Sequence, residues 1–79
     1  MGKFPAATYR DIIKVAKKIG FYFCRQAKGS HEIWRRDSDG KRTTIPNHGG
    51  KVLKRKTLKA ILDDMQITAE EFIKFKNKK

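Results

Sequence analysis

The sequence predicts an α+β fold in which a helix, three antiparallel strands and a second helix follow one another, with a short helix at the end. Apolar residues recur at helical spacing near both ends of the chain, and aromatic and β-branched residues concentrate between them. The pair Asp39-Gly40 divides two strand-like runs, which is one of the stronger short-range signals of a β-hairpin. The 79 residues leave room for a single modest core, so we expect one domain over residues 1–79.

The first helix is expected to begin after Thr8, because a threonine followed three residues later by an acid, here Asp11, is close to a capping box. Apolar residues then recur at helical spacing, and basic residues fall mostly on the opposite side. The apolar stripe consists of Ile12, Ile13, Ala16 and Ile19. Gly20 follows and is well suited to end the helix in a left-handed conformation.

Three short strands are expected between the helices, over residues 21–26, 32–36 and 41–45. Two hairpins join them into an antiparallel meander. The period of two places Ile33 and Trp34 on opposite faces of this sheet. We expect one face to pack on the helices and the other to stay partly open. Pro46 is expected to end the third strand, because proline lacks the backbone N–H that a strand ladder needs.

Residues 46–51 are rich in turn formers and are expected to form a loop. The second main helix follows, with Thr57 as its expected cap. Its apolar face would consist of Leu58, Ile61, Leu62 and Met65. A last short helix is expected to open at Thr68, where Glu71 would complete a capping box. The Lys-rich end, residues 74–79, is expected to fray.

Charge is the first indication of function. Twenty Lys and Arg against eight Asp and Glu give a formal charge of +12, spread along the whole chain. So large a charge on so small a chain implies a polyanionic partner. Nucleic acid fits this requirement best, and an acidic protein could accompany it. An anionic membrane surface fits less well, and no apolar run approaches the roughly 20 residues that a membrane span needs.

Cysteine and histidine usage bears on disulfides, metal sites and the cellular compartment. Cys24 is the only cysteine, which excludes an intrachain disulfide and a cysteine-rich zinc site. The N-terminus has no signal-peptide pattern, and both features favour a reducing cytoplasm. The two histidines lie far apart, and no acidic cluster has the spacing of metal ligands. We therefore expect neither a metal ion nor another cofactor.

The predicted order of elements, with a basic lead into the second main helix, is the layout of a double-stranded-RNA-binding domain. In that fold the start of the last helix contacts phosphates across a groove. Lys54, Arg55 and Lys56 stand at this position, where the helix dipole and free backbone N–H groups would add to their charge. We expect this cluster to contact phosphate together with Lys28 and Lys51. For any single lysine, an ordinary solvated charge is the alternative.

The turn Lys28-Gly29-Ser30-His31 carries the main candidate for chemistry. RNA supplies its own nucleophile, the 2′-hydroxyl, so a protein needs only to transfer protons and stabilise charge. His31 can act as a general base or acid near neutral pH. Lys28 and the backbone N–H groups of Gly29 and Ser30 would stabilise the crowded phosphorus centre. The alternative is a surface or structural histidine.

Other candidates are weaker. His48 lies in a Gly-rich loop and would take part only if it reached the same phosphate; the alternative is that it caps or hydrogen-bonds the turn. A serine nucleophile at Ser30 is not favoured, because no aspartate is evidently placed to complete a triad with it. Tyr22 and Trp34 either stack a base on the open face of the sheet or pack in the core.

An ordered set of short segments runs from about Tyr9 to Phe72. The segments are Tyr9-Arg10-Asp11-Ile12-Ile13, Gly20-Phe21, Arg25-Gln26, Lys28-Gly29-Ser30-His31, Ile45-Pro46-Asn47-His48-Gly49-Gly50 and Thr57-Leu58-Lys59-Ala60-Ile61-Leu62. In this order and spacing the sequence resembles the HicA family of toxin ribonucleases, found in bacterial and archaeal toxin–antitoxin pairs. The resemblance implies a double-stranded-RNA-binding-like fold and a toxin that cleaves messenger RNA until a HicB antitoxin inhibits it.

The family's essential histidine corresponds to His31. Two positions depart from the family pattern. Many members carry a second histidine directly after the first, where this chain has Glu32, and a glycine often precedes Thr57, where this chain has Lys56. Two classes of function stay open. One is a metal-independent endoribonuclease toxin that uses His31, and the other is a non-catalytic RNA-binding module in which this histidine is incidental.

Overall fold

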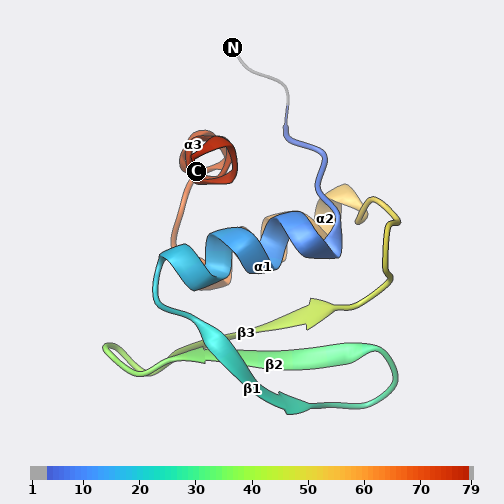
Figure 1. Ribbon diagram of the computed structural model, residues 1–79, viewed down its shortest axis with the longest axis vertical. Coiled ribbons are helices and arrows are strands. Elements are labelled where there is room, and N and C mark those ends of the chain that lie inside the picture. Colours follow the sequence, from blue (N-terminus) through green and yellow to red (C-terminus); the bar gives the residue numbers. More distant parts are fainter. Residues whose placement is uncertain (1–3, 79) are drawn as a thin grey trace.

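The computed structural model describes residues 4–78, which form three helices and a three-stranded sheet (Figure 1). The elements are α1 (Tyr9–Lys18), β1 (Tyr22–Gln26), β2 (His31–Arg36), β3 (Lys41–Pro46), α2 (Arg55–Met65) and α3 (Ala69–Asn77). The strands pair antiparallel in the order β1-β2-β3. This confirms the predicted α+β fold and the order of its elements. Within residues 4–78, no helix has the length and apolar character needed to cross a bilayer.

The first helix begins and ends as the sequence predicts. The Thr8 hydroxyl accepts a hydrogen bond from the backbone N–H of Asp11, whose carboxylate accepts one from the backbone N–H of Thr8. At the other end Gly20 adopts a φ of +98°, and the N–H of Phe21 donates to the carbonyl of Ala16 at 2.9 Å. This Schellman arrangement ends α1 and directs the chain into the core at Phe21, which is 2% exposed.

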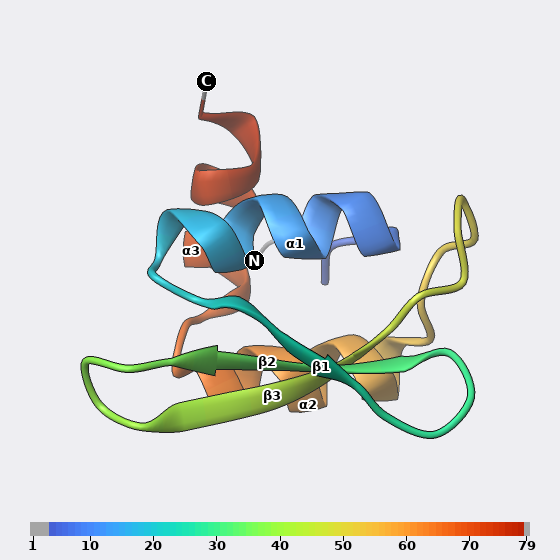
Figure 2. The same cartoon turned by 60° about the horizontal axis from the view of Figure 1, so that its bottom comes forward.

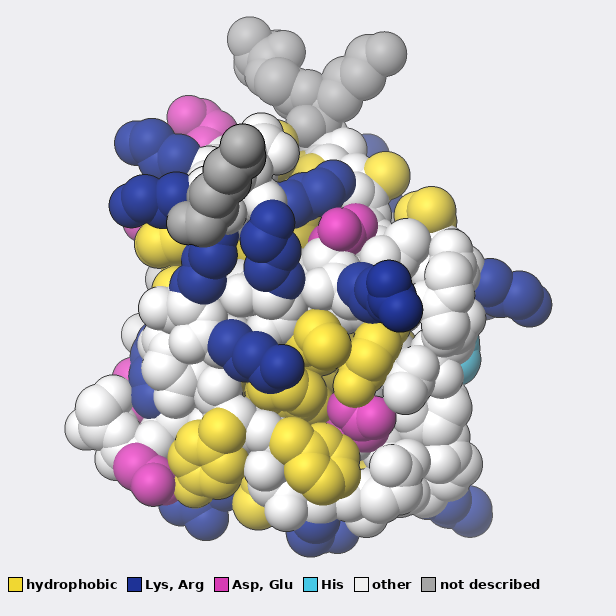
Figure 3. Space-filling model, viewed as in Figure 1, with side chains coloured by type: hydrophobic (Ala, Val, Ile, Leu, Met, Phe, Trp, Pro, Cys, Tyr) yellow, Lys and Arg dark blue, Asp and Glu magenta, His cyan; other side chains and the backbone are white. Residues whose placement is uncertain are grey.

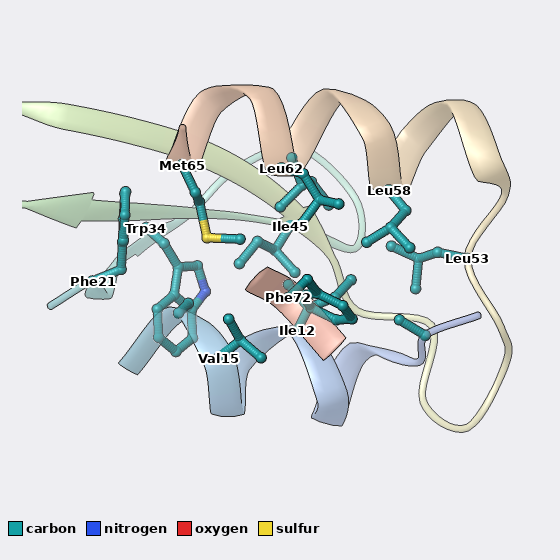
Figure 4. Packing of buried hydrophobic residues seen from close by; sticks show 13 residues of the cluster. Ile12, Val15, Phe21, Trp34, Ile45, Leu53, Leu58, Leu62, Met65 and Phe72 are labelled. Atoms are coloured by element: carbon teal, nitrogen blue, oxygen red, sulfur yellow. The ribbon is translucent and has the colours of Figure 1, made fainter. Parts of the chain in front are cut away.

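The core lies between the sheet and the helices (Figure 4). The predicted apolar face of α2 is buried at all four positions: Leu58, Ile61, Leu62 and Met65. Trp34 and Ile45 contribute from the sheet, Ile12 and Val15 from α1, and Phe72 from α3. The sheet therefore packs on the helices through one face only, which confirms the expectation of a covered face and an open one.

The start of α2 differs from the prediction. The helix begins at Arg55 with Lys54 at the N-cap, so Thr57 lies inside the first turn and does not cap it. The chain just before this start is fixed by the segment that precedes α1. Thr8 forms a β-bridge with Val52, and the N–H of Leu53 donates to the carbonyl of Ala7 at 2.8 Å, which holds the chain extended up to that point. Lys54 has no side-chain acceptor, so this helix end lacks a side-chain cap.

The C-terminal helix is longer than predicted. Its start is the expected capping box of Thr68 and Glu71, but the helix continues to Asn77, so residues 74–77 are helical and not frayed. Lysines of α1 supply the reason. Lys14 donates to the carbonyl of Lys76 at 2.9 Å, and Lys18 donates to that of Phe75 at 2.8 Å. These ammonium groups satisfy carbonyls at the negative end of the helix dipole. Lys79 lies outside the described residues.

The open face of the sheet is defined by the pairing register. Glu32 and Trp34 of β2, with Thr43 and Ile45 of β3, point toward the helices and are buried. The register places the alternate side chains on the open face: Tyr22, Arg25, His31, Ile33, Arg35, Arg42 and Thr44. Between Phe23 and Arg25 the register shifts by one residue, so Phe23 pairs with Trp34 and Arg25 pairs with the next residue of β2, Ile33. The two side chains therefore lie on opposite faces of the sheet. Figure 2 shows the sheet with α1 on one side of it.

Candidate active site

The turn that precedes β2 is held by hydrogen bonds to its own backbone carbonyls. The N–H of Ala27 donates to the carbonyl of His31 at 2.8 Å, and the side chain of Gln26 donates to the carbonyls of Gly29 and His31. Gly29 adopts a φ of +63°, a left-handed conformation that favours glycine. This turn sets His31 at the first position of β2, on the open face and exposed.

The loop after β3 packs against the same turn. The N–H of Asn47 donates to the carbonyl of Ser30 at 2.8 Å, and Nε2 of His48 lies 3.0 Å from Oγ of Ser30. Pro46 is the cross-strand partner of His31. The structure thus places His48 beside the residue that precedes His31, although the two histidines are far apart in the sequence. Both imidazoles are exposed.

The predicted phosphate-binding lysines gather at one end of the molecule. Figure 1 shows the turn before β2, the loop after β3 and the start of α2 at this end. The four lysines on these segments are exposed: Lys28, Lys51, Lys54 and Lys56. Arg55 differs from them, because its guanidinium lies 5.1 Å from the centre of the Phe4 ring in a cation–π contact. The structure therefore leaves Lys54 and Lys56 as the freer cations at the uncapped end of α2.

The two aromatic candidates have different positions. Trp34 is 3% exposed and packs in the core, where its ring meets Phe23 edge to face. It cannot stack a base on the open face. Tyr22 is 42% exposed, lies on the open face, and donates from its hydroxyl to the carboxylate of Asp37 at 2.8 Å. Of the two, only Tyr22 remains a candidate for contact with a ligand.

The sequence interpretation missed a buried carboxylate next to His31. Glu32 is 7% exposed, and its carboxylate accepts hydrogen bonds from three side chains. The hydroxyl of Tyr9 donates to Oε1 at 2.7 Å, and Nε1 of Trp34 donates to the same oxygen at 3.0 Å. The amide of Asn47 donates to Oε2 at 3.3 Å. The network consequently joins α1 and β2 to the loop that carries His48.

The buried carboxylate of Glu32 affects the pKa of Tyr9. Burial of the phenol, followed by its hydrogen bond to Glu32, raises the pKa of Tyr9 to about 12. The phenol therefore stays protonated and keeps donating to Glu32 across the ordinary pH range. The sequence did contain a signal of this network. Glu32 shares a strand face with Trp34, and an acid at an inward position needs hydrogen-bond donors around it.

The turn before β2 and the loop after β3 lie against each other, and the contact between Ser30 and His48 joins them. His31, His48 and Ser30 lie on two adjoining segments, with the lysines on the same segments and on the start of α2. Among residues 4–78, no three His, Cys, Asp or Glu side chains gather in a way that could hold a metal ion.

A family model described as "HicA toxin of bacterial toxin-antitoxin" matches residues 9–67 of the sequence. The chain belongs to the HicA toxin family. The matched part runs from the first residue of α1 past the end of α2, so it contains both histidines and Glu32, whereas α3 lies outside it. Among curated proteins, no match to this HicA-family chain was found. The protein is therefore the toxin of a toxin–antitoxin pair, and an antitoxin is its expected partner.

Proposed function

We propose that this HicA-family toxin is an endoribonuclease that cleaves messenger RNA through attack of the RNA 2′-hydroxyl, with His31 as general acid or base. The observation that carries the proposal is the exposed His31 at the start of β2, beside the Ser30–His48 contact. Such a site suits a polyanion, and the chain has a formal charge of +12. Its messenger RNA substrate would be met in the cytoplasm.

The proposed reaction exchanges one P–O bond for another. The imidazole of His31 takes the proton of the 2′-hydroxyl, whose oxygen attacks the neighbouring phosphorus. The bond from phosphorus to the 5′-oxygen breaks, and this oxygen receives a proton from water or from an imidazolium. His48 is placed to supply that second proton if it reaches the same phosphate. Lys28 and the backbone N–H groups of Gly29 and Ser30 stabilise the charge on the phosphoryl oxygens.

Cleavage by the wild-type toxin is expected to persist in excess chelator, because an imidazole transfers the proton and the RNA provides the nucleophile. The measurement is a time course of labelled RNA with and without chelator. A magnesium-dependent nuclease, assayed in parallel, shows that the chelator is in excess. Activity that disappears with chelator and returns with magnesium would reject the metal-independent mechanism.

Phosphate contacts at the start of α2 should show in the salt dependence of binding. We propose that Lys28, Lys51, Lys54 and Lys56 hold the RNA backbone, so that binding releases counterions and weakens as salt rises. The change Lys54→Gln with Lys56→Gln should reduce the slope of log affinity against log salt by about 1.4 for a single strand. The control removes Lys17 and Lys74 in the same way, since these exposed residues lie on α1 and α3. An unchanged slope in the first pair would place the RNA elsewhere.

We further propose that a HicB-type antitoxin inhibits the toxin by covering His31. A partner that buries the imidazole blocks proton transfer, and its acidic groups compete for the cations that hold phosphate. Hydrogen exchange of the complex should therefore show protection at residues 28–31 and over the adjoining basic surface. Protection confined to the far side of α1, with His31 still open to solvent, would count against direct masking.

A further inference from the structure

The open face of the sheet carries a second group of cations. Arg25, Arg35 and Arg42 come from three different strands, are all exposed, and share this face with His31. The strands contain one acidic residue, Glu32, and it points to the opposite face. Strand residues thus give this face positive charge and no carboxylate, and the turn after β2 adds one, Asp37, which accepts from the hydroxyl of Tyr22. All three cations are arginines, although fourteen of the twenty basic residues in the chain are lysines.

Two of these arginines are placed where they repel each other. Arg35 and Arg42 are direct cross-strand partners, an arrangement that destabilises a sheet when the charges are alike. The only relief between residues 4 and 78 is an ion pair of Arg35 with Asp37 at 3.9 Å, and the Asp37 side chain is 73% exposed. So open and long a pair contributes little.

Arg36 is an arginine with a structural role, and its contacts differ from those of the open-face arginines. Its guanidinium makes two hydrogen bonds to Asp39, at 3.1 and 2.8 Å, and one to the carbonyl of Ile19 at 2.9 Å. It also lies 4.7 Å from the centre of the Phe21 ring. Arg36 is thus fully engaged on the covered side, whereas Arg25 and Arg42 form no ion pair within residues 4–78. Arg25 and Arg42 are exposed and therefore available to a ligand, and Arg35 is held only by its long, open pair with Asp37.

We infer that the open face of the sheet binds single-stranded RNA that continues from the cleaved phosphate. The inference rests on the proposed function, because His31 lies on the same face and marks where the strand would enter. A planar guanidinium can bind a phosphate through two hydrogen bonds, which favours arginine over lysine at such positions. Between the arginines, Tyr22 and the half-buried Ile33 offer a base an aromatic and an apolar surface.

Total charge alone does not locate this RNA path, because basic side chains also cover the helical side of the molecule. Figure 3 shows Lys and Arg over α1 and α3, with hydrophobic side chains exposed toward β1. Two of the lysines there stabilise the fold, since Lys14 and Lys18 donate hydrogen bonds to carbonyls of α3. What distinguishes the open face is the combination of arginines without an ion pair in residues 4–78 (Arg25 and Arg42), an exposed aromatic ring and continuity with His31.

The test compares two charge-matched double variants in binding to an uncleavable 2′-O-methyl oligoribonucleotide of about twelve nucleotides. One is Arg35→Gln with Arg42→Gln, and the control is Lys17→Gln with Lys74→Gln. Affinity is measured by fluorescence anisotropy over a range of salt. The arginine variant should lose about 1.4 from the slope and roughly tenfold or more in affinity at low salt, whereas the control should stay close to wild type. Because Arg35 and Arg42 repel each other, the arginine variant should melt at or above the wild-type temperature.

Three results would overturn the inference. They are an unchanged slope in the arginine variant, an equal loss in both variants, which would reflect bulk charge only, and an arginine variant that binds the oligonucleotide normally but loses the antitoxin. The last result would assign the face to the protein partner. A wild-type protein that binds the oligonucleotide but never cleaves RNA would count against the proposed function alone, since this measurement does not depend on cleavage.

Discussion

Replacing His31 with alanine is expected to lower the rate of RNA cleavage by roughly 10²–10⁴-fold, the usual contribution of a positioned acid or base. RNA binding should change little, because the positive charge of the surface comes from lysines and arginines. The fold should also persist, since the turn is held by the backbone of His31 and not by its exposed side chain. Cleavage rate, oligonucleotide affinity and melting temperature are measured on the same preparation.

Two further variants sharpen this test. Ser38→Ala changes an exposed residue in the turn between β2 and β3, at the other end of the molecule, and should leave cleavage unchanged. His48→Ala asks whether the second imidazole supplies the leaving-group proton, in which case cleavage falls while His31 is intact. Cleavage at the wild-type rate in His31→Ala would refute the proposed mechanism. No cleavage by the wild type or by any variant, with RNA binding retained, would identify the protein as a non-catalytic RNA-binding module.

Most local patterns predicted the fold correctly, the expected Thr57 cap of α2 being the exception. The apolar period of residues 58–65, the Thr8–Asp11 capping box and the left-handed Gly20 each act within a few residues, and all three are confirmed. The end of α3 was not predictable in this way. Its carbonyls are held by Lys14 and Lys18, from a helix about 60 residues earlier. Such contacts depend on how the helices pack, which the pattern of a single segment does not show.

The candidate site was predictable only in part, for the same reason. His31 could be chosen because its turn and strand are local features. Its neighbours come from other segments: His48 meets Ser30 across 18 residues, and the amide of Asn47 reaches Glu32 across 15 residues. From the sequence, Glu32 was notable only as the residue that replaces the second histidine of many family members. The structure shows that this carboxylate holds the loop that carries His48, through the amide of Asn47.

Replacing Glu32 with alanine is expected to lower the free energy of unfolding by about 2–3 kcal/mol. The change leaves the hydroxyl of Tyr9, the indole N–H of Trp34 and the amide of Asn47 without their common acceptor, and burial at this position limits replacement by water. For a chain of this length the loss corresponds to a fall in melting temperature of roughly 8–24 °C. Thermal and urea denaturation of the purified toxin measure it.

The conservative change Glu32→Gln separates the two oxygens of this carboxylate. Its remaining carbonyl oxygen can still accept from Tyr9 and Trp34, as Oε1 does now, so the cost should be smaller, about 1 kcal/mol. The side-chain NH2 of the new glutamine replaces Oε2 and faces the side-chain NH2 of Asn47, so that hydrogen bond is lost. The loop should loosen, and the backbone N–H of Asn47, which donates to the carbonyl of Ser30, should exchange faster. Loss of the negative charge should also lower the pKa of Tyr9 part of the way from about 12, while burial keeps it above the usual value. A Glu32→Ala protein as stable as wild type would show that the network adds nothing to the free energy of unfolding. The gain from its three hydrogen bonds would then only offset the cost of burying the carboxylate.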